Sequence, residues 1–205
     1  MPLLPLDAPV KLSLRPDQKL DADAFYDFCV ANPDIRMELT AEGEIIVMPP
    51  AGMESDHQSL QAGSKLQQYA DRDGRGVASG SSAGFTLPSG AVRSPDAAWT
   101  SKVRLRAVAY SQRRRFPRVV PEFVVEVMSP SDTLTEAQAK MQEWMAAGVE
   151  LGWLIDGDAR TVVIYRAGQE PETRTGIEEI AGEGPVAGFV LQLESLWAGL
   201  EDTTE

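Results

Sequence analysis

The stretch "PEFVVEVMSPSDT", residues 121–133, places one carboxylate, Glu126, inside a run of valines. A continuous Val-rich run between Pro121 and a Ser-Pro-Ser turn is typical of a central strand that is buried on both faces of an α/β sheet. An ionised side chain is costly in such a place unless it has a partner. Glu126 therefore either reaches solvent or an arginine at the end of its strand, or belongs to a metal or catalytic site.

The segment that follows this strand predicts the fold class. Residues 134–147 carry apolar side chains at helical spacing, Thr133 and Glu136 have the form of a capping box, and Gly148 is suited to end the helix. The segments "LGWLID" and "TVVIYR" then resemble two strands joined by a turn. A helix between strands at 122–128 and 151–155 forms a βαβ unit. We therefore predict an α/β or mixed α+β fold, with a central mixed β-sheet flanked by helices.

The preceding half of the chain predicts further elements. We expect a helix over 21–33, a β-hairpin over 35–48, a helix over 56–72 that Ser55 caps, and strands near 84–87 and 91–100. The Gly/Ser-rich segment before residue 84 lacks the Gly-Lys-Ser/Thr of a P-loop. We interpret residues 1–205 as one domain, with an amino-terminal extension (1–50), a core (51–170) and a β-like tail (171–205).

Composition narrows the class of protein. The chain has 205 residues, of which 43% are hydrophobic and 24% charged, as is ordinary for a soluble globular domain. The first 18 residues contain four prolines and no sustained apolar stretch, so they resemble neither a secretory signal nor a membrane span. The single cysteine, Cys29, excludes an internal disulfide and a thiolate metal cage. We expect a cytoplasmic protein without a membrane partner.

The charge distribution gives two conflicting indications. A net charge of −12 argues against a nucleic-acid binder, because attraction to phosphates normally appears as a basic excess. However, residues 101–118 hold 7 of the 19 Lys and Arg residues. This basic strip is either a solvated surface or a phosphate contact, with Arg113, Arg114 and Arg115 as the candidates.

Three polar residues of the predicted core could form one site. Asp96 in "SPDAAW" and Glu126 belong to adjacent β segments, and Lys140 lies on the helix that follows. If the two strands pair, the carboxylates meet at one end of the sheet, and each raises the pKa of the other unless a cation lies between them. Two carboxylates, a backbone carbonyl and water make a hard-oxygen site suited to Mg²⁺ or Mn²⁺.

These motifs resemble the Uma family of restriction-endonuclease-like proteins, within the PD-(D/E)XK nuclease superfamily. The resemblance rests on "PD", a strand Glu followed by "SPS", a helix-borne Lys and "GWLID", and it extends from "MELTAEGEIIVMPP" to "GFVLQLESLW". It implies that Asp96, Glu126 and the carbonyl of Val127 hold Mg²⁺ or Mn²⁺. It also implies that Lys140 orients the water that hydrolyses DNA. The superfamily pattern places Lys two residues after Glu, where this chain has Met128, so Lys140 must replace it.

The family pattern also places residues similar to His57 and Glu38 near the site. His57 is otherwise a surface or capping residue at a helix start, and Glu38 otherwise faces water. A different class of function is a nuclease-like fold that only binds nucleic acid or protein, which the net charge and the missing Glu-x-Lys favour. A two-carboxylate glycosidase is the weakest alternative, because its cleft needs exposed aromatics and the tryptophans lie in apolar segments. We expect DNA as the partner and a homodimer as the assembly.

Overall fold

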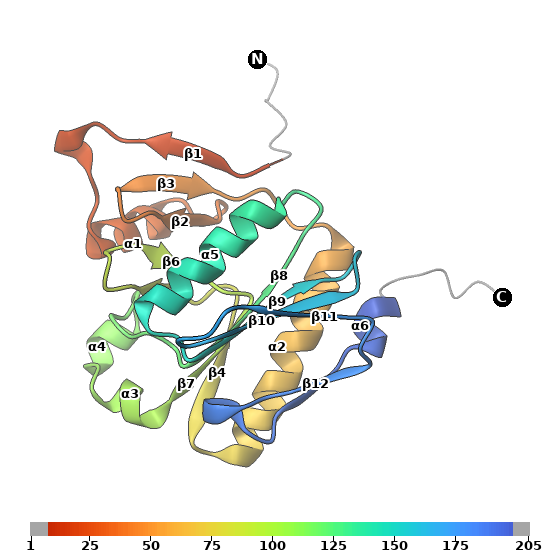
Figure 1. The fold of residues 1–205 in the computed structure, drawn as a ribbon. Coiled ribbons are helices and arrows are strands. Elements are labelled where there is room, and N and C mark those ends of the chain that lie inside the picture. The colour runs from red at the N-terminus through yellow and green to blue at the C-terminus, as the bar shows by residue number, and fades with distance from the viewer. Residues whose placement is uncertain (1–7, 199–205) are drawn as a thin grey trace.

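The six-stranded mixed sheet lies at the centre of the molecule in the computed structural model, which describes residues 8–198 (Figure 1). Strand β8 (Phe123–Val127) pairs in parallel with β9 (Leu151–Asp156), and the helix α5 (Leu134–Ala147) connects them, which confirms the predicted βαβ unit. The other neighbours in this sheet are antiparallel. In spatial order the strands are β11 (Glu172–Thr175), β10 (Thr161–Arg166), β9 (Leu151–Asp156), β8 (Phe123–Val127), β7 (Ala97–Ser101) and β4 (Gly76–Gly80).

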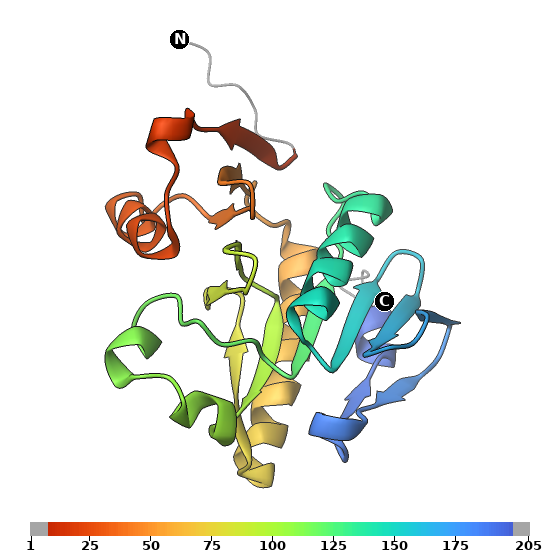
Figure 2. The same ribbon diagram turned by 60° about the vertical axis from the view of Figure 1, so that its left-hand side comes forward.

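Two long helices cover opposite faces of this sheet (Figures 1 and 2). They are α2 (Met53–Asp73) and α5 (Leu134–Ala147). Alternate strand residues point to opposite faces, so Val125 packs in the cluster beneath α2 whereas Val124 packs in the cluster beneath α5. Trp99, Trp144 and Trp153 are all buried, as the apolar patterns predicted. Side chains at even positions near the end of β8 therefore face α5.

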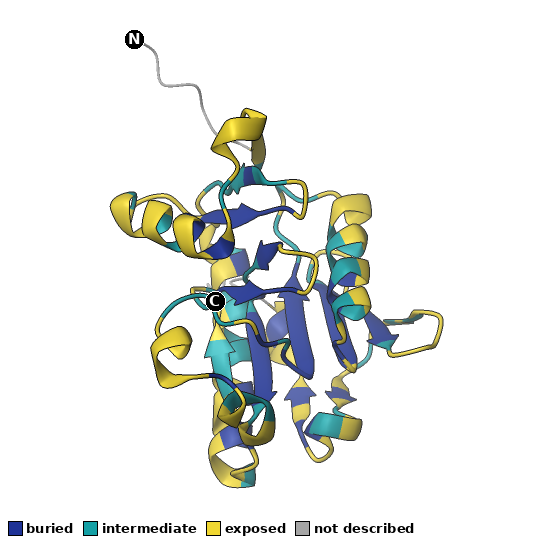
Figure 3. Ribbon diagram, turned by 90° about the vertical axis from the view of Figure 1, so that its left-hand side faces the viewer, coloured by how far each residue is buried: buried dark blue, intermediate teal, exposed yellow. Residues whose placement is uncertain are grey.

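A second sheet of five antiparallel strands packs beyond one end of the central sheet (Figure 3). Its predicted hairpin is confirmed, because Met37 pairs with Val47. The helix α1 (Ala22–Ala31) covers one face, where Phe25 packs with Leu39 and Ile45. In spatial order the strands are β1 (Val10–Ser13), β3 (Glu44–Val47), β2 (Met37–Leu39), β6 (Val92–Arg93) and β5 (Phe85–Thr86).

The predicted strand at 91–100 is divided between the two sheets. Its first part, β6, pairs with β2, and its second part, β7, pairs with β4 and β8. Pro95 lies at the break, because proline has no N–H to donate to a ladder and fixes its own φ. Asp96 consequently lies where the chain passes from one sheet to the other.

The helix boundaries differ in part from prediction. Thr133 caps α5 and accepts a hydrogen bond from the amide of Glu136, and Gly148 ends it with a φ of 110°, as predicted. The prediction that Ser55 caps α2 is wrong, because α2 begins at Met53. The Ser55 hydroxyl lies in the first turn of this helix and donates to the Gly52 carbonyl. The Gly/Ser-rich segment forms the edge strand β4, which its composition did not indicate.

Short elements complete the fold. They are η1 (Pro16–Gln18), α3 (Lys102–Arg106), α4 (Tyr110–Arg113), β12 (Glu179–Ala181), η2 (Gly184–Val186), β13 (Val190–Gln192) and α6 (Glu194–Ala198). Strands β12 and β13 pair as a ribbon, which agrees with the predicted β-like tail. Within residues 8–198, no helix has the length and apolar character needed to span a membrane. Residues 1–7 of the predicted extension and 199–205 of the predicted tail lie outside the described residues.

Candidate active site

The two carboxylates predicted from the sequence lie on neighbouring strands at one end of the central sheet. The antiparallel ladder pairs Ala97 with Val125, and one further step of this register sets Asp96 opposite Glu126. Residues opposite each other in such a ladder have Cα atoms about 4.5–5.5 Å apart. The carboxylate of Asp96 accepts a hydrogen bond of 2.8 Å from the amide of Val127, which fixes it beside β8.

Lys140 extends from α5 to this end of the sheet. Its ammonium lies 3.0 Å from Oε1 of Glu126 and 3.1 Å from Oε1 of Glu38. It also donates to the carbonyl of Ser94 at 3.2 Å. The alternative of a surface pair with Glu136 or Glu143 is not observed among these contacts, because Glu143 binds an arginine instead. The structure thus places a cation between carboxylates of two different sheets.

Glu38 lies at the centre of this cluster rather than in water. Its neighbours Met37 and Leu39 pack against α1, so the alternation of β2 directs Glu38 to the opposite face, where α5 lies. Only 4% of Glu38 is exposed. Beyond Lys140, it accepts hydrogen bonds of 3.0 Å from Arg93 and of 3.0 Å from the amide of Ser94.

Two contacts in the cluster were not predicted from the sequence. Trp144, one helical turn after Lys140, donates its indole N–H to Oε1 of Glu126 at 2.8 Å. Arg93 joins Glu38 to Glu143 of α5, whose Oε2 lies 2.6 Å from its Nε. The spacing of Lys140 and Trp144 placed both on one face of the helix, so the first contact had a sequence signal. The second had none, because Arg93 lies on a two-residue strand.

Burial and charge set the protonation states of the carboxylates. Burial raises the pKa of Glu126 to about 7. The charge of Lys140 acts to lower this pKa, whereas the negative charges of Asp96 and Glu38 act to raise it. Burial also raises the pKa of Asp96, which Lys140 and the Val127 amide oppose. For Glu38, burial is outweighed by Lys140 and Arg93, so its pKa is lowered. Glu38 is therefore a permanent anion near neutral pH, whereas Glu126 can gain or lose a proton there.

Lys140 remains charged in this environment. Burial alone would lower its pKa, but the carboxylates of Glu126, Glu38 and Asp96 outweigh that effect and raise it. The ammonium is thus a fixed positive charge among three acidic groups. A fixed cation beside carboxylates can stabilise negative charge that develops in a reaction at this position.

His57, which the family pattern places near the site, contacts a residue of its own helix instead. One ring nitrogen lies 2.7 Å from Nε2 of Gln61 on the same helix. This helix, α2, covers the sheet face opposite α5. Within residues 8–198, the structure shows no hydrogen bond or ion pair between His57 and the carboxylate cluster.

The basic strip contacts other parts of the protein. The guanidinium of Arg115 lies 2.6 Å from Asp27 of α1 and 4.4 Å from the centre of the Tyr26 ring. Arg113 donates to the carbonyl of Val108, whereas Arg114 is exposed. The strip begins at Ser101, the last residue of β7, and the five residues of this strand place that position about 17 Å from Asp96 at 3.3 Å per residue. Phosphate binding by these arginines stays a prediction.

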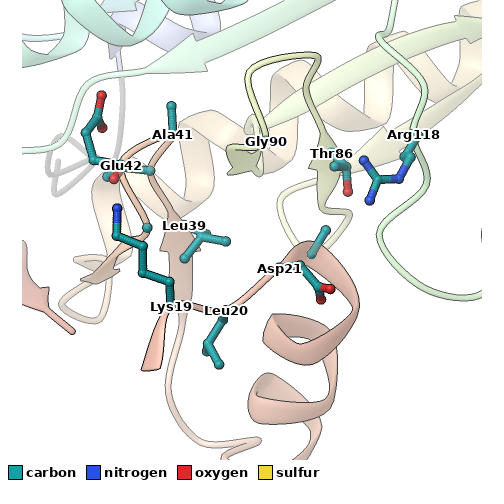
Figure 4. A pocket seen from close by; sticks show the side chains of 12 residues that line it. Lys19, Leu20, Asp21, Leu39, Ala41, Glu42, Thr86, Gly90 and Arg118 are labelled. Carbon is teal, nitrogen blue, oxygen red and sulfur yellow. The ribbon is translucent and has the colours of Figure 1, made fainter. Parts of the chain in front are cut away.

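A hollow of about 260 Å³ lies beside α1 (Figure 4), and its lining does not include Glu38, Asp96, Glu126 or Lys140. Leu39 lines it from β2, and Lys19 and Arg118 contribute its basic side chains. Leu39 and Glu38 are adjacent in a strand, so they point to opposite faces of the sheet. The hollow is therefore not the space between Asp96 and Glu126.

The donor atoms at the cluster can be compared with the requirements of a metal. Within residues 8–198, no three His, Cys, Asp or Glu side chains form a complete metal-binding group. A site there would use two carboxylates, with backbone oxygen and water as further ligands. Oδ2 of Asp96 accepts a hydrogen bond from the Val127 amide, and the contact of Oδ1 within residues 8–198 is the Arg36 guanidinium at 3.9 Å. Asp96 thus has an oxygen available, and oxygen ligands fit Mg²⁺ or Mn²⁺.

Comparison with known proteins identifies the family. The family model described as "Uma2: Putative restriction endonuclease" matches residues 22–194, which include every residue of the cluster. The chain belongs to the Uma2 family. This confirms the family resemblance found in the sequence. The match extends from α1 into α6, so it includes the whole central sheet and four strands of the second sheet, whereas β1 precedes it.

A solved structure supports the fold of this Uma2 protein. It is the crystal structure of a "putative nuclease belonging to DUF820" from Anabaena variabilis ATCC 29413, with 21% sequence identity and a TM-score of 0.68. The similarity covers 87% of this chain and 98% of that chain. The comparison with curated proteins gave no match. The structural similarity confirms the predicted mixed α/β fold.

Proposed function

We propose that this Uma2 protein is a Mg²⁺- or Mn²⁺-dependent endonuclease that hydrolyses phosphodiester bonds in DNA. The observation that carries the proposal is the Lys140 ammonium 3.0 Å from Glu126, beside an aspartate in register with that glutamate. Lys140 thereby supplies the cation that the superfamily pattern places at Met128. Membership of a family of restriction-endonuclease-like proteins supports the same reaction class.

The residues divide the chemical tasks among them. Asp96 and Glu126, with the carbonyl of Val127, would hold the ion. The ion would act as a Lewis acid and lower the pKa of bound water. The Val127 amide and the Trp144 indole fix the two carboxylates, so their oxygens need little reorganisation. The fixed charge of Lys140 orients a water for attack on phosphorus and stabilises the negative charge that develops.

Glu38 has a separate task in this scheme. Because its pKa is lowered, it remains an anion and holds the ammonium of Lys140 when Glu126 is occupied by another cation. The charge near the reacting phosphate then stays in place throughout the reaction. Glu38 is thus proposed as a positioning residue for Lys140.

A cleavage assay on Lys140→Met tests the proposal. Wild type should convert supercoiled plasmid to nicked or linear DNA with Mg²⁺ or Mn²⁺. The variant should lose activity by about 100-fold or more, the usual effect of removing one stabilising donor from an active site. Lys65→Met, on the exposed side of α2, is the matched control and should retain activity. Circular dichroism and thermal melting establish that each variant is folded, and Asp96→Asn provides a second inactive variant.

The same assay separates the binding-module alternative. Folded wild type that binds DNA but leaves it intact with either ion is a binding protein. Activity of Lys140→Met equal to that of wild type would place the reaction elsewhere. A homodimer and a cytoplasmic location stay predictions.

A further inference from the structure

Arg36 lies at the solvent side of the carboxylate cluster. It precedes β2 by one residue, and its carbonyl accepts a hydrogen bond of 2.9 Å from the amide of Met48, which fixes its backbone. Its Nη2 lies 3.9 Å from Oδ1 of Asp96 and 3.5 Å from the carbonyl of Ser81. The side chain is 44% exposed. The guanidinium thus stands between the available oxygen of Asp96 and solvent.

The contacts of Arg36 are long compared with those of the other cations around the cluster. Arg93 binds two carboxylates at 2.6 and 3.0 Å, and Lys140 is within 3.2 Å of two carboxylates and a carbonyl. Arg115, outside the cluster, lies 2.6 Å from Asp27. A guanidinium has five N–H donors, and the described contacts of Arg36 use few of them. Arg36 therefore has donor capacity that faces solvent beside Asp96.

A nucleic-acid strand needs such a donor at this position. The protein has a net charge of −12, and the three acidic side chains of the cluster outnumber its two cations, Lys140 and Arg93, so a phosphate that approaches the metal-free cluster meets net repulsion. The guanidinium presents parallel N–H groups that match two oxygens of a phosphate. Nη2 of Arg36 lies 3.9 Å from Oδ1 of Asp96, so the two charges are within interaction distance.

We propose that Arg36 binds the non-bridging oxygens of a backbone phosphate of the nucleic-acid substrate, next to the phosphate that reacts at Asp96. This inference rests on the proposed nuclease function and adds a substrate-binding residue from the five-stranded sheet side of the site. The long contacts to Asp96 and Ser81 orient the guanidinium without saturating it. On binding, these contacts are exchanged for shorter ones to phosphate.

The salt dependence of DNA binding tests this assignment. Fluorescence anisotropy with a labelled duplex oligonucleotide is measured from 50 to 200 mM salt, with Ca²⁺ as the hard cation and a gel to verify intact DNA. Arg36→Gln should bind about tenfold more weakly, and the slope of log K against log salt should become shallower by about 0.9, because one phosphate contact is lost. Arg36→Lys should retain the slope, because the positive charge remains. It should bind DNA more weakly than wild type, because lysine lacks the parallel N–H donors of a guanidinium.

Arg72→Gln is the matched control. Arg72 is an exposed arginine at the carboxyl-terminal end of α2, on the sheet face opposite α5. Equal slopes for Arg36→Gln and wild type, or equal losses for Arg36→Gln and Arg72→Gln, would overturn the inference and leave the proposed function intact. Wild type that binds no DNA under these conditions would overturn both. Thermal melting establishes that the variants are folded. If Arg36→Gln does not fold, the affinity of Arg36→Lys relative to wild type provides the test.

Discussion

Glu126 should make the stability of the metal-free protein depend on pH near neutrality. Its pKa rises from 4.5 to about 7 on folding, mainly because it is buried. Between these values the folded protein binds a proton that the unfolded chain does not, so this contribution to stability declines as pH rises. The decline is on the order of 3 kcal/mol, at 1.36 kcal/mol per pKa unit. Glu38 acts in the opposite sense, but its lowered pKa confines that effect to more acidic pH.

Urea unfolding of wild type and Glu126→Gln, in chelator at pH 5, 6, 7 and 8, measures this contribution. The free energy of unfolding of wild type relative to the variant should fall by about 2–3 kcal/mol from pH 5 to pH 8. The glutamine keeps the size of the side chain and an acceptor for the Trp144 indole. A difference that is constant over this range would contradict the raised pKa.

Individual site residues were predictable to different degrees. Asp96, Glu126 and Lys140 could be selected because the two carboxylates lie in adjacent predicted strands, the lysine lies on the helix that follows, and their order resembles the family motif. Glu38 could not be separated from a solvent-facing residue, because alternation in β2 shows only that it points away from α1. What covers that face is α5, about 100 residues later in the chain, and the contact depends on how the two sheets pack.

Arg93 links three elements, since it lies in β6 and binds Glu38 of β2 and Glu143 of α5. Arg93→Met should lower the free energy of unfolding by about 3 kcal/mol, because it leaves a buried carboxylate without one of its cations. Hydrogen exchange in β2 should become faster. Urea unfolding and exchange measured by mass spectrometry provide the two readings.

The control for this link is Arg15→Met. Arg15 is 74% exposed and 4.0 Å from its partner Asp17, so its loss should cost less than about 0.5 kcal/mol. Equal effects of the two substitutions would show that Arg93 does not hold the sheet to the helix. A large effect of Arg93→Met on the free energy of unfolding without faster hydrogen exchange in β2 would show that Arg93 stabilises a part of the protein other than β2.

Helices and strands could be predicted from the sequence where their apolar pattern extended over several residues. The buried strand β8 and the capped helix α5 were both predicted, as was the parallel pairing with β9. Strand β4 was missed because glycine is normally depleted in strands. Gly76 is needed there because a Cβ at that position would lie 2.3 Å from the Trp99 ring. Such a constraint appears only after the two strands are paired.

The whole molecule assembles its candidate site from both sheets. The five-stranded sheet supplies Glu38 and Arg93, the central sheet supplies Glu126, and Asp96 lies in the crossing between them. Within the described residues, the predicted extension contributes to the site through Glu38 of β2. The family match from residue 22 onward is consistent with that arrangement.

Metal binding is the property on which this account depends most directly, and calorimetric titration with Mn²⁺ at pH 8 measures it. At this pH Glu126 is ionised, so wild type should bind about one ion per chain at this site, and Asp96→Asn should weaken that binding by about tenfold or more. Asp34→Asn, at an exposed loop position, is the control and should match wild type. Equal Mn²⁺ affinity of Asp96→Asn and wild type, or no binding by folded wild type, would contradict the assignment of Asp96 and Glu126 as metal ligands.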